Sequence, residues 1–345
     1  MKRILNPIAN YLARQINEKL EISSYKPELN RTSFSENTAC DSLKIDAQFL
    51  PEQGVDIGEK MSFYNNFPEN RLRAPYVCSS QLCNTEFFGL PLFQYWMKLL
   101  KISPRIDRKH WEYVYITQAL YENGMLTPGK RGLGFACGKE PLPALFASMG
   151  CEILATDLDI NDARSTKWVE SNQNTMNAIE HLNERDICPP DRFAECVNFR
   201  SMDMNEIPKE LFEKFDFNWS SCAVEHIGGM EKSMHFLTEN LKTLKSGGIA
   251  VHTFEFNLSS NDDTCFLPDS FIFRKCDVEN ATQALRTEGH EVYPLDFKVG
   301  TYLSDSFIDT YPYMRHNAHL RLVLEKYIAT SFGFIVRKGQ SSRMI

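Results

Sequence analysis

A loop of small residues followed by an acidic residue is the strongest chemical signal in the sequence. Gly132, Gly134, Ala136 and Gly138 have little or no side chain, so their backbone can approach a ligand closely. Asp157 follows about twenty residues after this loop, at the end of the next apolar run. A carboxylate at that position can accept hydrogen bonds from both hydroxyls of a ribose. Together these residues indicate a nucleoside site, with a tight turn beside a solvated carboxylate as the alternative.

Candidate reacting groups follow a later apolar run. Ser221 ends the run 215–221, and His226 comes shortly after it. Groups at the carboxyl end of a parallel strand face the ligand of such a sheet, so Ser221 is a candidate ligand contact. An imidazole can take a proton from a hydroxyl or ammonium group, which makes His226 the candidate general base. A hydrogen-bonded structural histidine is the alternative. His252 and Glu255 are second candidates, and strand alternation places their side chains on opposite faces.

The elements that position these residues follow the pattern of a doubly wound α/β fold. Short apolar runs alternate with amphipathic helices after Gly129, as in a mostly parallel sheet with helices on both faces. The last β-rich run, 327–336, is expected to be antiparallel at a sheet edge. The other predicted strands are 152–156, 197–202, 215–221, 249–256 and 291–295. The predicted helices cover 142–149, 230–244 and 278–285, and a buried helix over 111–119 is expected to lead into this part of the chain.

The length of 345 residues predicts one main domain with an addition, because single cores stop growing at about 250–300 residues. We expect an N-terminal helical and loop-rich extension over 1–105, a candidate cap for an acceptor, and the main domain over 106–345. Apolar residues at steps of four over 2–20 indicate a helix packed on its own domain or on a second subunit, with membrane-surface binding as the alternative. Residues 21–70 are polar, broken by proline and glycine, and predicted as loops.

Charge, apolar runs and cysteine spacing argue against a nucleic-acid-binding, membrane-spanning or disulfide-bonded protein. The net charge of −7 disfavours nucleic acid as a partner, because phosphate backbones would be repelled. No run of the sequence reaches the 18 or more apolar residues that a membrane-spanning helix needs. The ten cysteines lack paired C-x-x-C knuckles, so we expect reduced thiols and a cytoplasmic protein.

Four motifs in order resemble those of class I S-adenosylmethionine-dependent methyltransferases. Gly134–Gly138 is similar to their G-x-G-x-G loop with alanine at the middle glycine, and Ala155–Asp157 to the end of their second strand. Phe215–His226 resembles their fourth strand and its turn, and Leu244–Val251 their L-K-P-G-G turn with serine in place of proline. The longer segments 131–147 and 255–264 resemble a bacterial subgroup of undefined substrate.

This resemblance implies a Rossmann-like fold, S-adenosylmethionine as cofactor, and methyl transfer as the activity. It implies that Asp203 meets the adenine amino group, with a surface role as the alternative. The family usually has an acidic residue where this chain has Gly132. Glu225 and His226 also resemble the end of an E-x-x-E-H motif for a divalent metal, but Cys222 replaces the first glutamate, so we expect no metal.

The acceptor is expected to be a small molecule or a glycan, methylated at a hydroxyl group. Arg105, Arg108, Lys109 and His110 form a basic cluster that could hold an anionic or sugar-like acceptor, with a solvated helix start as the alternative. An NAD-dependent oxidoreductase is a competing interpretation, since a glycine loop and an acidic strand end also serve NAD. A non-catalytic module that binds an adenosyl group is a third.

Overall fold

The computed structural model describes residues 77, 79–171, 173–174, 179–267, 270–313 and 318–340. The helix predicted over 2–20 and the loops predicted over 21–70 lie outside these residues. Among the described residues, no helix has the length and apolarity required to cross a membrane.

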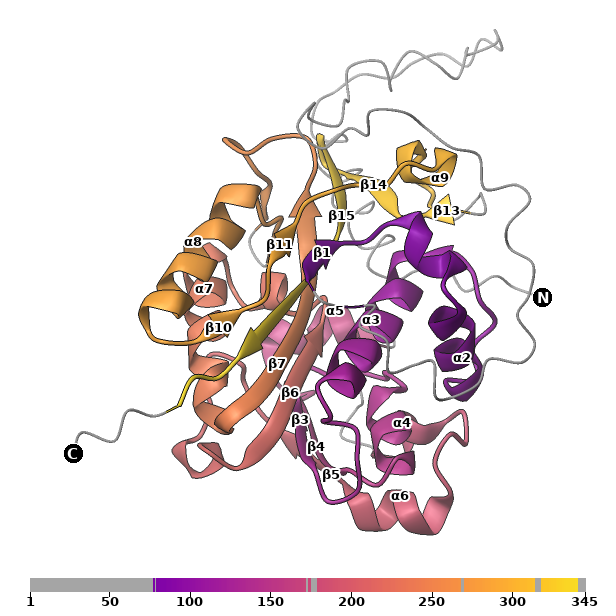
Figure 1. Cartoon of the computed structure of the whole chain (residues 1–345), viewed down its shortest axis with the longest axis vertical. Helices are drawn as coiled ribbons and strands as arrows, with labels where there is room; N and C mark the ends of the chain where they lie inside the picture. The colour runs from indigo at the N-terminus through magenta and orange to yellow at the C-terminus, as the bar shows by residue number, and fades with distance from the viewer. Residues whose placement is uncertain are drawn as a thin grey trace, which may run out of the picture.

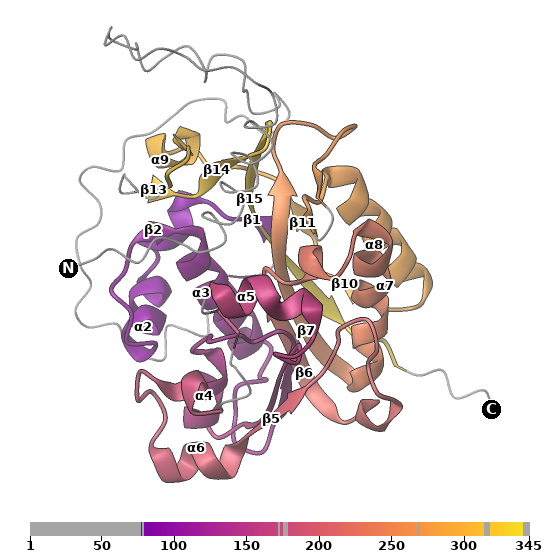
Figure 2. The ribbon, with the colours of Figure 1, turned by 180° about the vertical axis from the view of Figure 1, so that it is seen from behind.

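A twisted central sheet runs through the molecule, with helices on both faces (Figures 1 and 2). Its main path is β11-β1-β15-β7-β6-β3-β4-β5, in which the five strands from β7 to β5 are parallel. The main strands are β3 (Arg131–Gly134), β4 (Glu152–Asp157), β5 (Val197–Ser201), β6 (Phe215–Ser221), β7 (Leu244–Asn257) and β15 (Tyr327–Arg337). The predicted fold class is confirmed.

The C-terminal strand β15 is antiparallel, as predicted. It pairs with β7 from Ala329–Asn257 to Arg337–Ile249. β15 is the last long strand of the sheet. On the edge of β15 that faces away from β7, three short strands, β1, β10 and β14, each pair with a different part of the strand. The short strands are β1 (Ser80–Leu82), β2 (Ile106–Asp107), β8 (Phe266–Leu267), β9 (Ser270–Phe271), β10 (Glu291–Val292), β11 (Leu295–Asp296), β12 (Ile308–Asp309), β13 (Ala318–His319) and β14 (Arg321–Leu324).

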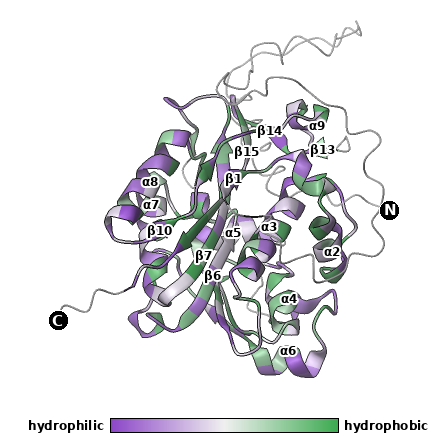
Figure 3. Ribbon diagram, viewed as in Figure 1, coloured by the Kyte–Doolittle hydropathy of each residue, from purple (hydrophilic) through white to green (hydrophobic). Residues whose placement is uncertain are grey.

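Two hydrophobic cores lie on the two faces of the sheet, because strand residues alternate between them. On β7, for example, Ile249 and Val251 belong to one core, and Ala250 and Phe254 to the other. Figure 3 shows apolar residues along the strands and on the helices that cover them. The helices are α2 (Pro91–Leu99), α3 (Arg108–Glu122), α4 (Leu142–Ser148), α5 (Thr166–Glu170), α6 (Pro190–Cys196), α7 (Met230–Glu239), α8 (Lys275–Thr287) and α9 (Leu303–Ser306).

The described part of the predicted extension shares the core of the main domain. Trp96 of α2 is fully buried, and its indole N–H donates to Gln118 of α3 at 2.6 Å. β1 joins the central sheet beside β15. The boundary at residue 105 and the acceptor cap stay predictions.

Helix α3 connects this N-terminal part to the sheet. Asp107 caps its first turn by accepting a hydrogen bond from the backbone N–H of Lys109 at 2.9 Å. The helix contacts β6, β7 and β15, and most of its residues are buried. Its first turn therefore brings charged side chains to the carboxyl ends of the parallel strands.

Candidate functional site

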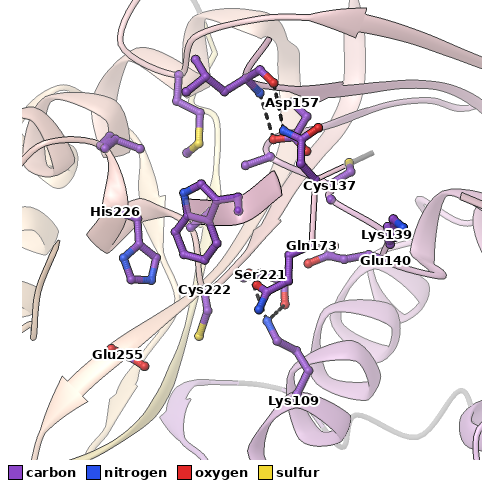
Figure 4. A pocket seen from close by; sticks show the side chains of 18 of the residues that line it. Lys109, Cys137, Lys139, Glu140, Asp157, Gln173, Ser221, Cys222, His226 and Glu255 are labelled. Carbon is purple, nitrogen blue, oxygen red and sulfur yellow. Dashed lines mark hydrogen bonds between the residues drawn. The ribbon is translucent and has the colours of Figure 1, made fainter. Parts of the chain in front are cut away.

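A cavity of about 530 Å³ opens at the carboxyl ends of the parallel strands (Figure 4). The strand β3 lies between β4 and β6, so the chain order reverses there, which is where doubly wound sheets bind their ligands. The volume lies within the range of small-molecule sites. The cavity is lined by the loop after β3, the ends of β4 and β6, the turn after β5, Glu255 of β7 and the first turn of α3.

Two of the predicted loop residues, Ala136 and Gly138, line this cavity. Both have positive φ angles, +47° and +52°. A Cβ atom on Gly138 would lie 2.5 Å from the backbone oxygen of Gln173, so only glycine fits there. The loop backbone is thus held against the cavity without side chains in the way.

Gly132 and Gly134 lie in β3 and are not among the residues that line the cavity. A Cβ on Gly132 would lie 2.4 Å from Cζ of Phe217, and one on Gly134 2.3 Å from Sγ of Cys137. Their small size is explained by packing against these neighbours. A contact between either glycine and a ligand stays a prediction.

Asp157 ends β4 and faces the cavity, with only 8% of its surface exposed. Its Oδ1 accepts a hydrogen bond from the backbone N–H of Leu158 at 2.8 Å. The amide of Asn174 donates to the carbonyl of Leu158 at 3.1 Å, which fixes the backbone after the strand. The carboxylate is therefore positioned before any ligand binds.

Asp203 follows β5 and also lines the cavity, but its carboxylate already has protein partners. Oδ1 accepts from the backbone N–H of Asn205 at 2.9 Å, and Oδ2 lies 2.8 Å from the guanidinium of Arg164. Partial burial opposes ionisation, yet these hydrogen bonds and the charge of Arg164 leave the pKa of Asp203 below its usual value. An adenine amino group would have to share this carboxylate with Arg164 and Asn205.

Ser221 belongs to a buried network of charges at the inner end of the cavity. Its hydroxyl donates to Oε2 of Glu112 at 2.9 Å and accepts from Nζ of Lys109 at 3.0 Å. Lys109 also lies 2.8 Å from Glu112, while Arg108 lies 2.6 Å from Glu255. Burial opposes ionisation of Glu112, but Lys109 and Arg108 together lower its pKa to about 2. Glu112 is thus a carboxylate at neutral pH.

Cys222 joins the same network from the turn after β6. Its thiol donates to Oε1 of Glu112 at 2.9 Å, and the hydroxyl of Ser331 donates to the same oxygen at 2.5 Å. Burial raises the pKa of the Cys222 thiol well above its usual value, so the thiol stays protonated. Cys222 acts here as a hydrogen-bond donor.

Glu225 does not line the cavity, although it is next to His226 in the sequence. Its Oε1 accepts a hydrogen bond from the backbone N–H of Glu255 at 3.1 Å. Burial, together with the negative charge of Glu255, raises the pKa of Glu225 to about 8. Within the described part of the chain, no group of three or more His, Cys, Asp or Glu residues could hold a metal ion.

His226 ends a 3₁₀ turn, Val224–His226, and lines the cavity. Its ring meets the indole of Trp168 edge to face, with 5.0 Å between the ring centroids. Figure 4 shows His226 across the cavity from Glu140. His252, the second candidate, is buried outside the cavity and bonded to the hydroxyl of Ser220 at 2.8 Å, and burial lowers its pKa to about 3. His252 is a neutral structural residue.

All four residues of the predicted basic cluster line the cavity: Arg105, Arg108, Lys109 and His110. Two of these cations are neutralised by Glu255 and Glu112, as described above. Arg105 is more open, with 59% of its side chain exposed and its guanidinium 3.4 Å from Asp107. Arg105 is thus the more solvent-accessible cation of this cluster, compared with Arg108 and Lys109.

The sequence interpretation missed Glu140, which also lines the cavity. Only 7% of its surface is exposed. Burial is the main reason that the pKa of Glu140 rises to about 8, and the carboxylates of Glu112 and Asp157 add to the effect. Its place two residues after Gly138 was a signal, but the charges of Lys109 and Glu112 that act on it come from the distant helix α3.

No family model and no curated protein matches this sequence. Among solved structures, phosphoethanolamine N-methyltransferase 2 of Haemonchus contortus is 14% identical, with 72% of this chain and 57% of that chain covered and a TM-score of 0.42. Magnesium protoporphyrin IX methyltransferase of Synechocystis is 11% identical, with 74% and 97% covered and a TM-score of 0.39. The [4+2]-cyclase SpnF is 16% identical, with 66% and 81% covered and a TM-score of 0.43. At such TM-scores these similarities decide nothing about activity.

Proposed function

We propose that this protein is an enzyme that transfers a methyl group from S-adenosylmethionine to a small molecule or glycan, at a hydroxyl group of the acceptor. The observation that carries the proposal is the position of Asp157. Its carboxylate is held at the end of β4, inside a cavity that continues to His226 and Glu255. Nucleoside binding and an acceptor site can thus share one cavity.

The residues present fit the adenosyl cofactor. Asp157 can accept hydrogen bonds from ribose hydroxyls, and the close backbone at Ala136 and Gly138 leaves room for the ligand beside it. Asp203 is a candidate contact for the adenine amino group, shared with Arg164. When bound, this cofactor supplies an electrophilic methyl group on a sulfonium, so the protein does not have to activate the methyl donor.

The protein's task would be to align the acceptor and exclude water. His226 faces the cavity and could accept the proton of an acceptor hydroxyl. The ion pairs Arg108–Glu255 and Lys109–Glu112 fix the inner wall, so the acceptor meets a rigid polar surface. The mechanism needs no metal ion, and Glu225 does not line the cavity but accepts a hydrogen bond from the backbone N–H of Glu255.

The sheet supports this proposal over an NAD-dependent oxidoreductase. The dinucleotide fold has six parallel strands in the order 3-2-1-4-5-6, whereas here the strand beside β7 is the antiparallel β15. A non-catalytic adenosyl-binding module has the same sheet, so only an activity measurement separates it from the proposed enzyme.

The cysteines among the described residues form no disulfide bonds. A cytoplasmic location stays a prediction.

Calorimetric titration of the purified protein with S-adenosylmethionine, S-adenosylhomocysteine and NAD tests the proposal. We expect the first two to bind and NAD to give no heat of binding. NAD binding without response to the other two would replace the proposal with the oxidoreductase. Incubating a cell extract with the protein and methyl-labelled cofactor, followed by mass spectrometry, would then identify the acceptor.

A further inference from the structure

Glu140 is a buried acid in the cavity with one carboxyl oxygen left without a protein partner. It ends the loop after β3, and its backbone N–H donates to the carbonyl of Cys137 at 2.9 Å, which fixes its position. Its Oε2 is inaccessible to solvent and receives no hydrogen bond from the described residues. Figure 4 shows the carboxyl group turned toward the centre of the cavity. A buried polar atom without a partner is costly, so a ligand group at this place would be stabilising.

The surroundings of Glu140 determine the charge of that ligand group. Helix α3 contributes Lys109, Glu112 and Tyr113, β4 contributes Asp157, and β6 contributes Ser221. Lys109 is the cation that most affects the pKa of Glu140, and it is already bonded to Glu112 and Ser221. Glu140 therefore lies near the carboxylates of Glu112 and Asp157, and Lys109 is already paired with Glu112.

In this setting the two protonation states of Glu140 favour different ligands. Burial and the neighbouring carboxylates keep the acid protonated at neutral pH, since its pKa is raised to about 8. A cationic ligand group would stabilise the carboxylate, and the acid would then release its proton to the solvent. A ligand carboxylate would instead favour the protonated acid as a donor, but it would also approach Glu112 and Asp157, which repel it.

We infer that Glu140 binds the ammonium group of the methionine portion of the cofactor, at the other end of the molecule from the ribose that Asp157 would hold. The inference rests on the proposed function. On binding, the proton of the Glu140 carboxyl group leaves to the buffer, and an ammonium N–H donates to Oε2. Glu140 is thus a positioning residue that orients the cofactor without touching the methyl group.

The test compares S-adenosylhomocysteine with 5′-methylthioadenosine, which keeps the adenosyl group but lacks the amino-acid end. Both ligands are titrated calorimetrically at pH 7 into the wild type and into Glu140→Gln, in two buffers of different ionisation enthalpy. The wild type should release about one proton per S-adenosylhomocysteine bound and almost none with 5′-methylthioadenosine. Glu140→Gln should bind S-adenosylhomocysteine about tenfold or more weakly, release no proton, and bind 5′-methylthioadenosine as the wild type does.

The control variant Asp157→Ala should weaken both ligands, because it removes the contact that they share. If Glu140→Gln binds S-adenosylhomocysteine as tightly as the wild type, or still releases the proton, the inference is overturned while the proposed function stands. Equal weakening of both ligands in Glu140→Gln would also overturn it, since that pattern means a structural role. A wild type that binds neither ligand would overturn the proposed function, and the inference with it.

Discussion

Asp157 is largely buried, but it lines the cavity. The effect of replacing it on ligand affinity can therefore be measured. Replacing it with alanine removes a charged acceptor for two ribose hydroxyls, each such bond being worth about 1.5–3 kcal/mol. We expect Asp157→Ala to bind S-adenosylhomocysteine at least tenfold more weakly while its melting temperature changes little. Titration calorimetry and a thermal melt measure the two effects separately. Unchanged affinity would mean that the ribose is held elsewhere.

His226 is the candidate base because it faces the cavity from the turn after β6. Once an acceptor is known, His226→Ala should lower turnover about a hundredfold or more, which is the usual size of acid–base assistance, and leave cofactor affinity almost unchanged. Turnover of the wild type should survive EDTA. The matched control is His252→Gln, since His252 lies outside the cavity. Normal turnover in His226→Ala would assign the histidine a packing role against Trp168.

The residues found from the sequence share one property: they lie at the carboxyl end of a strand or in the turn that follows it. Asp157, Ser221 and His226 line the cavity because the ends of parallel strands meet at one edge of the sheet. Glu112 and Glu140 were missed because their environment comes from helix packing across long sequence distances. Glu112, for example, meets Cys222 and Ser331, and no local pattern predicts those contacts.

At the scale of elements, the strands after residue 129 could be predicted because each is a short apolar run with clear ends. β6 matches its predicted bounds, and β7 extends beyond them at both ends. β7 begins earlier, at Leu244, because the first residues of the strand pair with Phe215 before a register shift. The predicted strand 291–295 is divided into β10 and β11, which pair with different partners. Such pairings depend on tertiary neighbours, which periodicity does not contain.

The packing of α3 against β15 can be tested by measuring the stability of a variant at their contact. Gly333 of β15 lies under the ring of Tyr115, and a Cβ there would be 2.1 Å from Cε1 of that ring. Because both residues are enclosed, Gly333→Ala should lower the free energy of unfolding by about 1–3 kcal/mol, the usual cost of overpacking. Chemical denaturation measures the change. The control Gly89→Ala meets no atom within 4 Å and should alter stability little. Equal stability of both variants would show that α3 can shift freely.

At the scale of the whole molecule, the cavity concentrates buried ionisable groups in a chain whose net charge is −7. The ion pairs of Arg108 and Lys109 neutralise two of the glutamates, Glu255 and Glu112. Glu225 and Glu140 have no such cation and are kept protonated by burial. Glu112 responds to pH in the opposite direction from Glu225 and Glu140, because Glu112 stabilises the fold as a carboxylate and the other two as neutral acids.

Glu225 allows this response to be isolated, since it lies outside the cavity. In the unfolded chain it ionises above about pH 4.3, whereas in the folded protein its pKa is about 8. Between these values the folded state holds a proton at Glu225 that the unfolded state has released, so the contribution of this residue to wild-type stability falls as pH rises. The fall attributable to this residue reaches about 1.4 kcal/mol per pH unit and ends above pH 8.

Glu225→Gln keeps the acceptor for the backbone N–H of Glu255 and removes the titration. We expect this variant and the wild type to differ little at pH 5, and the variant to become progressively more stable than the wild type toward pH 8. Urea denaturation across this pH range measures the difference. The control Glu195→Gln changes an exposed glutamate and should follow the wild-type curve. Parallel curves for Glu225→Gln and the wild type would mean that Glu225 is ionised in the folded protein, with Arg108, whose charge favours that form, as the compensating cation.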